Sequence, residues 1–221
     1  MRVINFDLDK FNNLKDKKWV LGNNVLYKLC LDYPNHINNE EIRAKIWLIG
    51  RSYAASIERR INKKRINDDF YDYVVQKFIK FNTKTKFDER LSKLKDKKFS
   101  EEILKDSLII HKELTNFFKE LTGNKKRSLA SKYLHFHVPI FPIYDSKSNN
   151  SIGKIVKGKI EKSELIGDID YSKFFHKILF LYNYIKNKTD NIPTLRKIDT
   201  YLVDTANERL REKNLNKRKD I

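Results

Sequence analysis

The sequence predicts a mainly α-helical protein, because apolar residues recur at spacings of three and four along most of the chain. Capping residues, glycines and prolines separate these segments, and the alternating pattern of strands is nearly absent. At 221 residues, with 40% hydrophobic content that includes 14 Phe and 11 Tyr, the chain can bury a substantial core. We therefore expect a folded, helical protein and no low-complexity chain.

The N-terminal half contains three predicted helices. After an irregular start with a short strand at residues 2–6, residues 23–33 form a helix that Pro34 ends. Asn38 or Asn39 caps a second helix, whose apolar face continues through residue 61. Asn67 caps a third, at residues 67–81. Residues 82–99 are nearly all polar and form the weakest predicted segment.

The C-terminal half contains the clearest helix, which begins at Ser100 and keeps its apolar residues on one face as far as Gly123. Residues 146–170 are interpreted as a polar connector, either strand-like or a loop. Residues 171–188 form a second strong helix, and Pro193 opens the last one, which gives way to a charge-rich tail from residue 207. We expect an N-terminal helical subdomain at residues 1–99 and a second subdomain at residues 100–221.

The net charge of the chain indicates a polyanionic partner. It is +18, with a pI near 9.7, and nucleic acid is the commonest partner of a basic protein, with acidic membrane lipid as the competitor. No apolar run approaches the roughly 20 residues that span a bilayer, and the first residues lack the apolar core of a secretory signal. We expect a cytoplasmic, nucleoid-associated monomer that binds double-stranded DNA and no membrane, without an obligate protein partner.

Cysteine and histidine patterns argue against redox and metal chemistry. Cys30 is the only cysteine and has apolar neighbours, so we expect a buried, inert thiol. His135 and His137 are two positions apart, which directs them to different faces of a helix, and no third ligand is near in sequence. His111 falls on an apolar helix face and is interpreted as a core residue. We expect no metal and no cofactor.

Residues 121–146 concentrate the reactive side chains. Gly123 forms a turn between two helices, and basic residues open the second helix, a pattern that offers backbone amides to a phosphate. A Pro-x-x-Pro run then leads to Asp145, about nineteen residues after Lys126. A carboxylate beside C1′ of a nucleotide stabilises a cationic sugar transition state, and a lysine amine of lowered pKa can attack C1′ and form a Schiff base.

This stretch resembles the helix-hairpin-helix DNA glycosylase superfamily, in particular its 8-oxoguanine glycosylase branch. The segment at residues 121–123 matches the start of the family's Leu-Pro-Gly-x-Gly hairpin, and the segment at residues 141–145 matches its apolar-Pro-apolar-x-Asp ending. Lys126 matches the family's lysine by its distance from the acid. The resemblance covers about residues 100–205.

The hairpin of this chain departs from the family's pattern at two positions. Thr122 stands where the family has proline, and the second glycine is absent. An ungapped count from Gly123 puts Arg127 in the place of the lysine. Lys125 and Lys132 therefore remain alternatives to Lys126.

The resemblance implies a helix-hairpin-helix glycosylase-like helical bundle with a cleft between helical subdomains. It implies a DNA repair enzyme, a DNA glycosylase with abasic-site lyase activity, that excises a damaged or modified purine such as 8-oxoguanine. Lys126 would be the nucleophile and Asp145 the carboxylate. The other predicted site residues are the DNA contacts Gly123, Lys125, Arg127, Ser128 and Lys147, and a base pocket of Trp47, Arg51, Tyr53, His135, Phe136 and Tyr144.

Simpler interpretations of the same residues stay open. Asp145 could only cap a helix, and Lys126 could only contact a phosphate. Tyr133 and Phe136 fit a hydrophobic core as well as a pocket. Under these interpretations the chain is a non-catalytic nucleic-acid-binding module. A defence-type protein that acts on nucleic acid through another reaction is a third interpretation.

Overall fold

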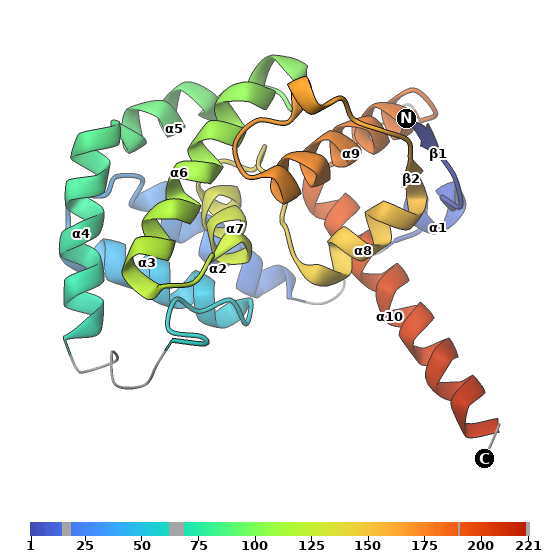
Figure 1. The fold of residues 1–221 in the computed structure, drawn as a ribbon, viewed down its shortest axis with the longest axis horizontal. Coiled ribbons are helices and arrows are strands. Elements are labelled where there is room, and N and C mark those ends of the chain that lie inside the picture. Colours follow the sequence, from blue (N-terminus) through green and yellow to red (C-terminus); the bar gives the residue numbers. More distant parts are fainter. Residues whose placement is uncertain (15–18, 62–68, 190, 220–221) are drawn as a thin grey trace. The chain divides into compact units, whose positions relative to one another are not determined.

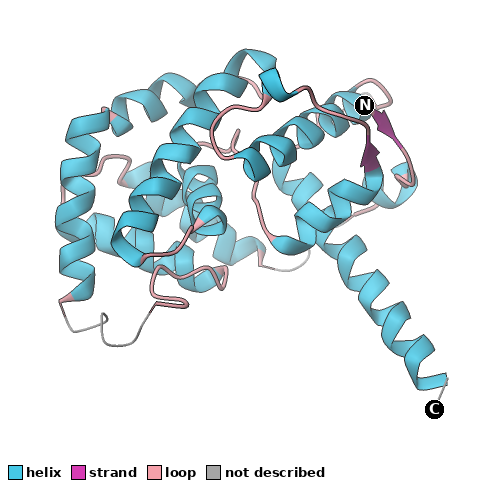
Figure 2. Cartoon of the chain, in the orientation of Figure 1, coloured by secondary structure: helices cyan, strands magenta, loops and turns pink. Residues whose placement is uncertain are grey.

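The computed structural model describes residues 1–14, 19–61, 69–189 and 191–219, with the backbone alone for residues 217–219. Helices make up most of these residues (Figures 1 and 2), which confirms the mainly α prediction. The chain packs as two compact units: unit 1 contains residues 1–17 and 142–221, and unit 2 contains residues 18–141. The predicted boundary at residue 99 falls inside unit 2 and remains a prediction.

Unit 2 consists of helices packed around an aromatic core. The ring of Phe78 contacts the rings of Phe117 at 5.1 Å, of Tyr133 at 5.6 Å and of Phe87 at 5.7 Å between centroids. Its elements in chain order are α2 (Val20–Asp32), α3 (Asn39–Ser52), α4 (Phe70–Thr85), α5 (Phe87–Lys95), the 3-10 helix η2 (Glu101–Ile103), α6 (Leu104–Thr122) and α7 (Arg127–His137). The predicted cap Asn67 lies outside the described residues.

Helix α3 begins where the sequence predicts and ends earlier. The Asn38 side chain caps it by accepting from the backbone N–H of Glu40 at 2.9 Å. The apolar pattern continues to residue 61, but the helix stops at Ser52 because the chain turns back over Gly50. A Cβ on Gly50 would lie 2.9 Å from the Ser56 Cα. Turns therefore replace the predicted helical end and still bury Ile57 and Ile61.

Helix α5 lies in the polar segment at residues 82–99, for which the sequence gives the weakest prediction. Phe87, Leu91 and Leu94 recur at helical spacing and are all buried, although lysines surround them in the sequence. Phe99, just beyond the helix, is also buried. Four apolar side chains thus suffice to hold this polar segment on the core.

Unit 1 contains the only strands among the described residues. β1 (Arg2–Val3) pairs antiparallel with β2 (Val156–Lys157), so that the start of the chain lies beside a segment about 150 positions later. The helices are α1 (Leu8–Asn12), α8 (Ser146–Ile155), the 3-10 helix η3 (Lys162–Glu164), α9 (Ile169–Lys186) and α10 (Leu195–Lys219). Phe11 of α1 packs on Tyr201 of α10 with ring centroids 5.8 Å apart.

Two predictions for unit 1 need correction. Residues 146–155 form helix α8 instead of a connector, because Ile152 and Ile155 provide a buried edge and Asp145 caps the first turn. The tail from residue 207 is not separate from the last helix, since α10 continues to Lys219. Its exposed charges are compatible with helix, because Arg, Lys and Glu are good helix formers. No helix in the described part of the chain is long and apolar enough to cross a membrane.

Candidate functional site

A tight turn connects α6 to α7, and side-chain hydrogen bonds close it. Gly123 ends α6 in a left-handed conformation with φ 74°, and its N–H donates to the Lys119 carbonyl at 2.8 Å. The Thr122 hydroxyl donates to the Phe118 carbonyl at 2.7 Å and accepts from the Asn124 N–H at 3.3 Å. The Thr122 hydroxyl thus fixes the turn by bonding to both sides of it.

Lys126 directly follows this turn, at the N-cap position of α7. Its side chain is buried, with 9% exposure, and its amine donates a hydrogen bond to the Arg59 carbonyl. Burial lowers the pKa of Lys126, and the nearby charges of Arg59 and Arg60 lower it further, against an opposing effect of Glu58. The neutral, nucleophilic form of the amine is therefore populated at a lower pH than in an ordinary lysine.

The two alternative lysines have different surroundings. Lys132 lies between one and two turns into α7 and is 3% exposed, and its amine donates to the Ser128 hydroxyl at 2.7 Å. The same amine lies 5.6 Å from the centre of the Tyr53 ring, within cation–π range. Lys125 is exposed in the turn. Two of the three candidates, Lys126 and Lys132, are therefore buried amines with fixed partners.

Asp145 stands directly before α8 and caps it. Its carboxylate accepts from the Ser148 N–H at 2.8 Å, so the simpler interpretation of this residue as a helix cap is correct as far as it goes. The Ser148 hydroxyl in turn donates to Asp199 of α10 at 2.8 Å, which fixes the start of α8. Asp145 belongs to unit 1 and Lys126 to unit 2, and their convergence remains a prediction.

The predicted DNA contacts divide in the same way. Gly123 and Lys125 are exposed in the hairpin, and Arg127 and Ser128 are partly exposed in the first turn of α7. Lys147 is exposed on α8 of unit 1, where its amine donates to the Asn207 side chain at 2.7 Å. Four of the five residues therefore lie within six positions of one another, at the turn between α6 and α7.

The predicted base-pocket residues of unit 2 fall into two groups. Tyr53, His135 and Phe136 are close together: the ring centroids of Tyr53 and Phe136 are 5.4 Å apart, and those of Phe136 and the preceding residue, His135, are 5.7 Å apart. Trp47 and Arg51 form the second group, with the guanidinium 6.0 Å from the indole ring and paired with Glu58. Tyr144 lies in unit 1, where it packs on Phe174 at 5.1 Å.

Hydrogen bonds hold His135 in one orientation. Its Nδ1 lies 2.8 Å from the Phe141 carbonyl, which can only accept, so Nδ1 carries the proton. Its Nε2 then accepts from the Tyr27 hydroxyl at 2.5 Å. Tyr27 also packs on Phe136 at 4.8 Å. His137, in contrast, turns its Nδ1 to the Tyr133 carbonyl at 2.8 Å, so the two histidines have different partners.

Tyr27 and Phe136 also line a pocket of about 830 Å³ in unit 2. Its walls are mainly apolar and include Leu31, Pro34, Leu91 and Val138, with Asp88 and His137 among the polar groups. Of the predicted base-pocket residues, Phe136 alone is part of this wall. The pocket has the volume typical of small-molecule sites.

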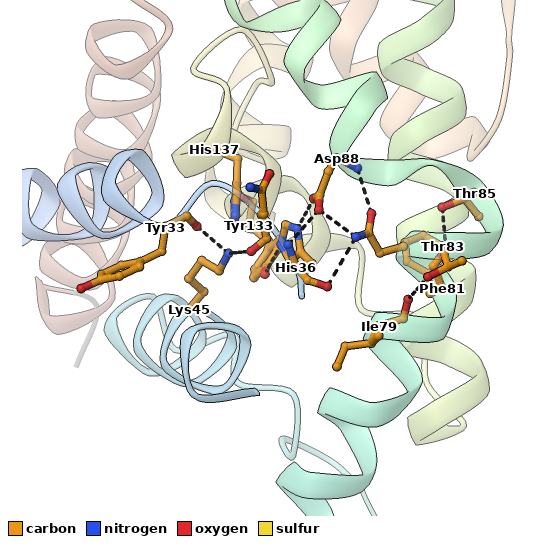
Figure 3. A network of polar contacts seen from close by, with 12 residues as sticks. Tyr33, His36, Lys45, Ile79, Phe81, Thr83, Thr85, Asp88, Tyr133 and His137 are labelled. Atoms are coloured by element: carbon orange, nitrogen blue, oxygen red, sulfur yellow. Dashed lines mark hydrogen bonds and ion pairs between the residues drawn. The ribbon is translucent and has the colours of Figure 1, made fainter. Parts of the chain in front are cut away.

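A buried polar network lies next to this pocket, and the sequence analysis missed it (Figure 3). His36 is the centre: its Nδ1–H donates to Asp88, and its Nε2 accepts from the Tyr133 hydroxyl at 2.7 Å. The Asn82 amide donates to Asp88 at 2.7 Å, and the Lys45 amine donates to the Tyr33 carbonyl at 2.7 Å. These groups come from α3, α4, α5, α7 and the loop before α3.

Burial controls the charges in this network. It lowers the pKa of His36 to about 4 and that of Lys45 to about 8. Burial would raise the pKa of Asp88, but hydrogen bonds from His36 and Asn82 outweigh it and lower the pKa. At neutral pH the network therefore contains a neutral histidine and an ionised carboxylate, and it fixes the Tyr33–Asn38 loop to the helices. No short-range signal in the sequence indicates it, since Asp88 is 52 positions and Tyr133 is 97 positions from His36.

The described residues include no group of three or more His, Cys, Asp or Glu side chains placed to hold a metal ion. Cys30 is buried, and burial raises the pKa of its thiol to about 12, which makes it unreactive. His111 is fully buried, as predicted, with Nε2 3.3 Å from the Arg127 carbonyl. No family model, curated protein or solved structure matches this chain.

Proposed function

We propose that the protein is a DNA glycosylase with abasic-site lyase activity that removes a damaged or modified purine, with Lys126 as nucleophile and Asp145 as carboxylate partner. The observation that supports this most is the Lys126 amine, which is buried beside a carbonyl and three charged residues after the turn between α6 and α7. Its lowered pKa is the property that an amine nucleophile needs at neutral pH. The resemblance to the 8-oxoguanine glycosylase branch supplies the substrate class.

In the proposed reaction the Lys126 amine attacks C1′ of the target nucleotide, and the bond from C1′ to the base nitrogen breaks. The base leaves with the bonding electrons and takes up a proton. The Asp145 carboxylate stabilises the positive charge that develops on the sugar. Ring opening gives a Schiff base, and loss of the C2′ proton then eliminates the 3′ phosphate and cuts the strand. The target base must leave the duplex before this chemistry.

Borohydride trapping tests the nucleophile. A duplex with one 8-oxoguanine is incubated with the protein and sodium borohydride, which reduces a Schiff base to a stable covalent adduct. We expect an adduct with the natural protein and none with Lys126→Ala. Lys125→Ala is the control: it replaces the exposed neighbouring lysine and should still give the adduct. An adduct that survives Lys126→Ala and disappears in Lys132→Ala would transfer the role to Lys132.

Asparagine at position 145 tests the carboxylate without loss of the helix cap, because Asn and Asp cap helices about equally well. We expect Asp145→Asn to keep thermal stability within about 0.5 kcal/mol and to slow base release by at least about 100-fold, as expected for loss of a group that stabilises transition-state charge. Asp145→Ala should lose about 1 kcal/mol of stability as well. An unchanged rate in Asp145→Asn would show that the carboxylate is a cap alone.

The hydrogen bond from Ser148 to Asp145 favours a second candidate, the non-catalytic nucleic-acid-binding module. In that case the hairpin binds phosphates and Asp145 only begins α8. The same assays separate the two candidates. Salt-sensitive DNA binding without an adduct and without base release, on every lesion tested, would support the module.

A further inference from the structure

The outer face of α8 in unit 1 is a stripe of polar and cationic residues. Lys147, Asn150 and Lys154 are exposed at spacings of three and four, which places them on one side of the helix. The helix contains no acidic residue between Ser146 and Ile155. The stripe extends about 10 Å along the helix axis, at 1.5 Å per residue.

Helix α9 adds cations along one side of this stripe. A hollow of about 370 Å³ lies between the two helices, and Lys154, Lys173 and Lys177 line it together with the amides of Asn149 and Asn150. The pKa of Lys177 is lowered by burial and by the charges of Lys157 and Lys173. The lysines on this side are therefore close enough to repel one another.

Helix α10 adds cations along the other side. A second hollow, of about 180 Å³, is lined by Lys147 and Lys154 of α8 and by Arg209 and Lys213 of α10. Lys154 and Asn150 line both hollows, so the two hollows are neighbours on either side of these residues of α8. Among the described residues, Asp170 is the only acid that lines either of them.

A hollow of unit 2 shows that this arrangement is not a simple result of abundant lysine. Lys77, Lys80 and Lys84 of α4 line a hollow of about 520 Å³, but Glu113 and Glu120 of α6 line it too. Lysines there have acidic neighbours within the same hollow. The excess of positive charge at α8 is thus a local property, and a patch that repels itself is stabilised by a bound polyanion.

We propose that the surface formed by Lys147, Lys154, Lys173, Lys177, Arg209 and Lys213, the α8 cationic face, binds the phosphate backbone of duplex nucleic acid. Each strand of B-DNA carries a phosphate about every 3.4 Å along the DNA axis, so a stripe of about 10 Å parallel to that axis covers the axial rise of about three phosphates. The side-chain amides of Asn149 and Asn150 can donate to phosphate oxygens between the amines. The face requires neither Lys126 nor Asp145 to be catalytic.

Salt dependence of DNA binding tests this proposal. Fluorescence anisotropy with a labelled duplex of undamaged sequence gives the affinity of the full chain at a series of salt concentrations. The triple substitution Lys154→Ala, Lys173→Ala and Lys177→Ala should weaken binding roughly 100-fold at about 0.1 M salt and reduce the slope of log affinity against log salt by about 2 to 3, since each phosphate contact contributes about 0.9. The matching triple Lys→Arg variant should keep the natural slope.

The control is the triple substitution Lys77→Ala, Lys80→Ala and Lys84→Ala on α4, which removes the same formal charge from the hollow that two glutamates also line. We expect it to change the affinity less than about threefold and to leave the slope unchanged. Equal losses in both triple variants would show a general effect of net charge and overturn the proposal. Arg209→Ala with Lys213→Ala, on the α10 side, provides a second test, expected to reduce the slope by about 1 to 2.

Two further outcomes separate this proposal from others. Stronger binding to vesicles of anionic phospholipid than to the duplex, lost in the same α8 variant, would identify a membrane surface instead of nucleic acid and overturn it. If the natural protein shows the expected salt slope, the α8 triple variant reduces it, and no lesion gives a borohydride adduct, then the proposed enzymatic function is wrong and the proposed binding by the α8 cationic face stands. An adduct that forms normally at high protein concentration in the α8 triple variant would show that the face binds and does not catalyse.

Discussion

At the scale of single residues, the hydrogen-bonded group of His36, Asp88 and Tyr133 makes unit 2 less stable as the pH falls. The folded-state pKa of His36 is about 4, below the ordinary value of 6.5. The unfolded chain therefore takes up the proton first as the pH falls, and stability is full above pH 6.5 and decreases between pH 6.5 and 4. Burial also lowers the pKa of His137, which acts in the same direction.

We predict that the free energy of unfolding falls by roughly 3 kcal/mol between pH 7 and pH 4 through His36 alone, because each unit of pKa difference corresponds to about 1.4 kcal/mol. Urea unfolding at several pH values, followed by fluorescence, measures it. His36→Gln removes the titrating group, lowers stability at pH 7 and should flatten the curve. A variant curve with the slope of the natural protein would contradict this assignment.

Prediction of these residues from sequence succeeded only where their partners are local. Gly123 ends α6, and Asn38 caps α3, through contacts within a few positions, so sequence patterns identify them. Lys126 could be selected by its distance from Asp145. The hydrogen-bond partner of its buried amine is the Arg59 carbonyl, 67 positions away, which no local pattern indicates. The His36 network depends on packing of four helices, which no spacing in the sequence indicates.

At the scale of elements, helices with continuous apolar faces were predicted and helices with narrow apolar edges were missed. Helix α6 buries nine residues along one side and has a glycine end signal, and α9 is similarly apolar. Helix α5 buries only three apolar residues and helix α8 only two, and Lys, Ser and Asn lie between them in the sequence. Their helical state depends more on contacts with neighbouring helices than on local pattern.

Leu91 of α5 provides a test of that dependence. It is 5% exposed, and we predict that Leu91→Ala lowers the free energy of unfolding by about 2–4 kcal/mol, as is usual for a buried leucine. Lys93→Ala, two positions away and exposed, should change it by less than about 0.5 kcal/mol. Chemical denaturation measures both. A loss below about 1 kcal/mol for Leu91→Ala would mean that α5 contributes little to the core.

At the scale of the whole molecule, the division into two compact units predicts separate responses to core substitutions. Phe11 of unit 1 and Phe87 of unit 2 are both buried, at 3% and 0% exposure. We predict that Phe11→Ala speeds amide exchange in α1, α10 and the β1–β2 pair, and that Phe87→Ala speeds it in α4, α5 and α6. Each substitution should cost its own unit about 3–5 kcal/mol.

Hydrogen exchange followed by mass spectrometry, peptide by peptide, makes this comparison, with each variant as the control for the other. Loss of protection in both units from either substitution would show that the chain unfolds as one cooperative body. Unit-specific loss would show that each unit has its own core, as the aromatic clusters around Phe78 in unit 2 and around Tyr201 in unit 1 indicate.

The pairing of β1 with β2 has a consequence for synthesis of the chain. Unit 1 is made from two segments, and all of unit 2 is translated between them. At about 5–20 residues per second, translation of the intervening segment takes on the order of 10 s. During that time unit 2 can fold on the ribosome. Phe6, Phe11 and β1 lack their native contacts with Tyr201 and β2 until those partners have been synthesised. The first residues of this protein are therefore among the last to reach their native contacts.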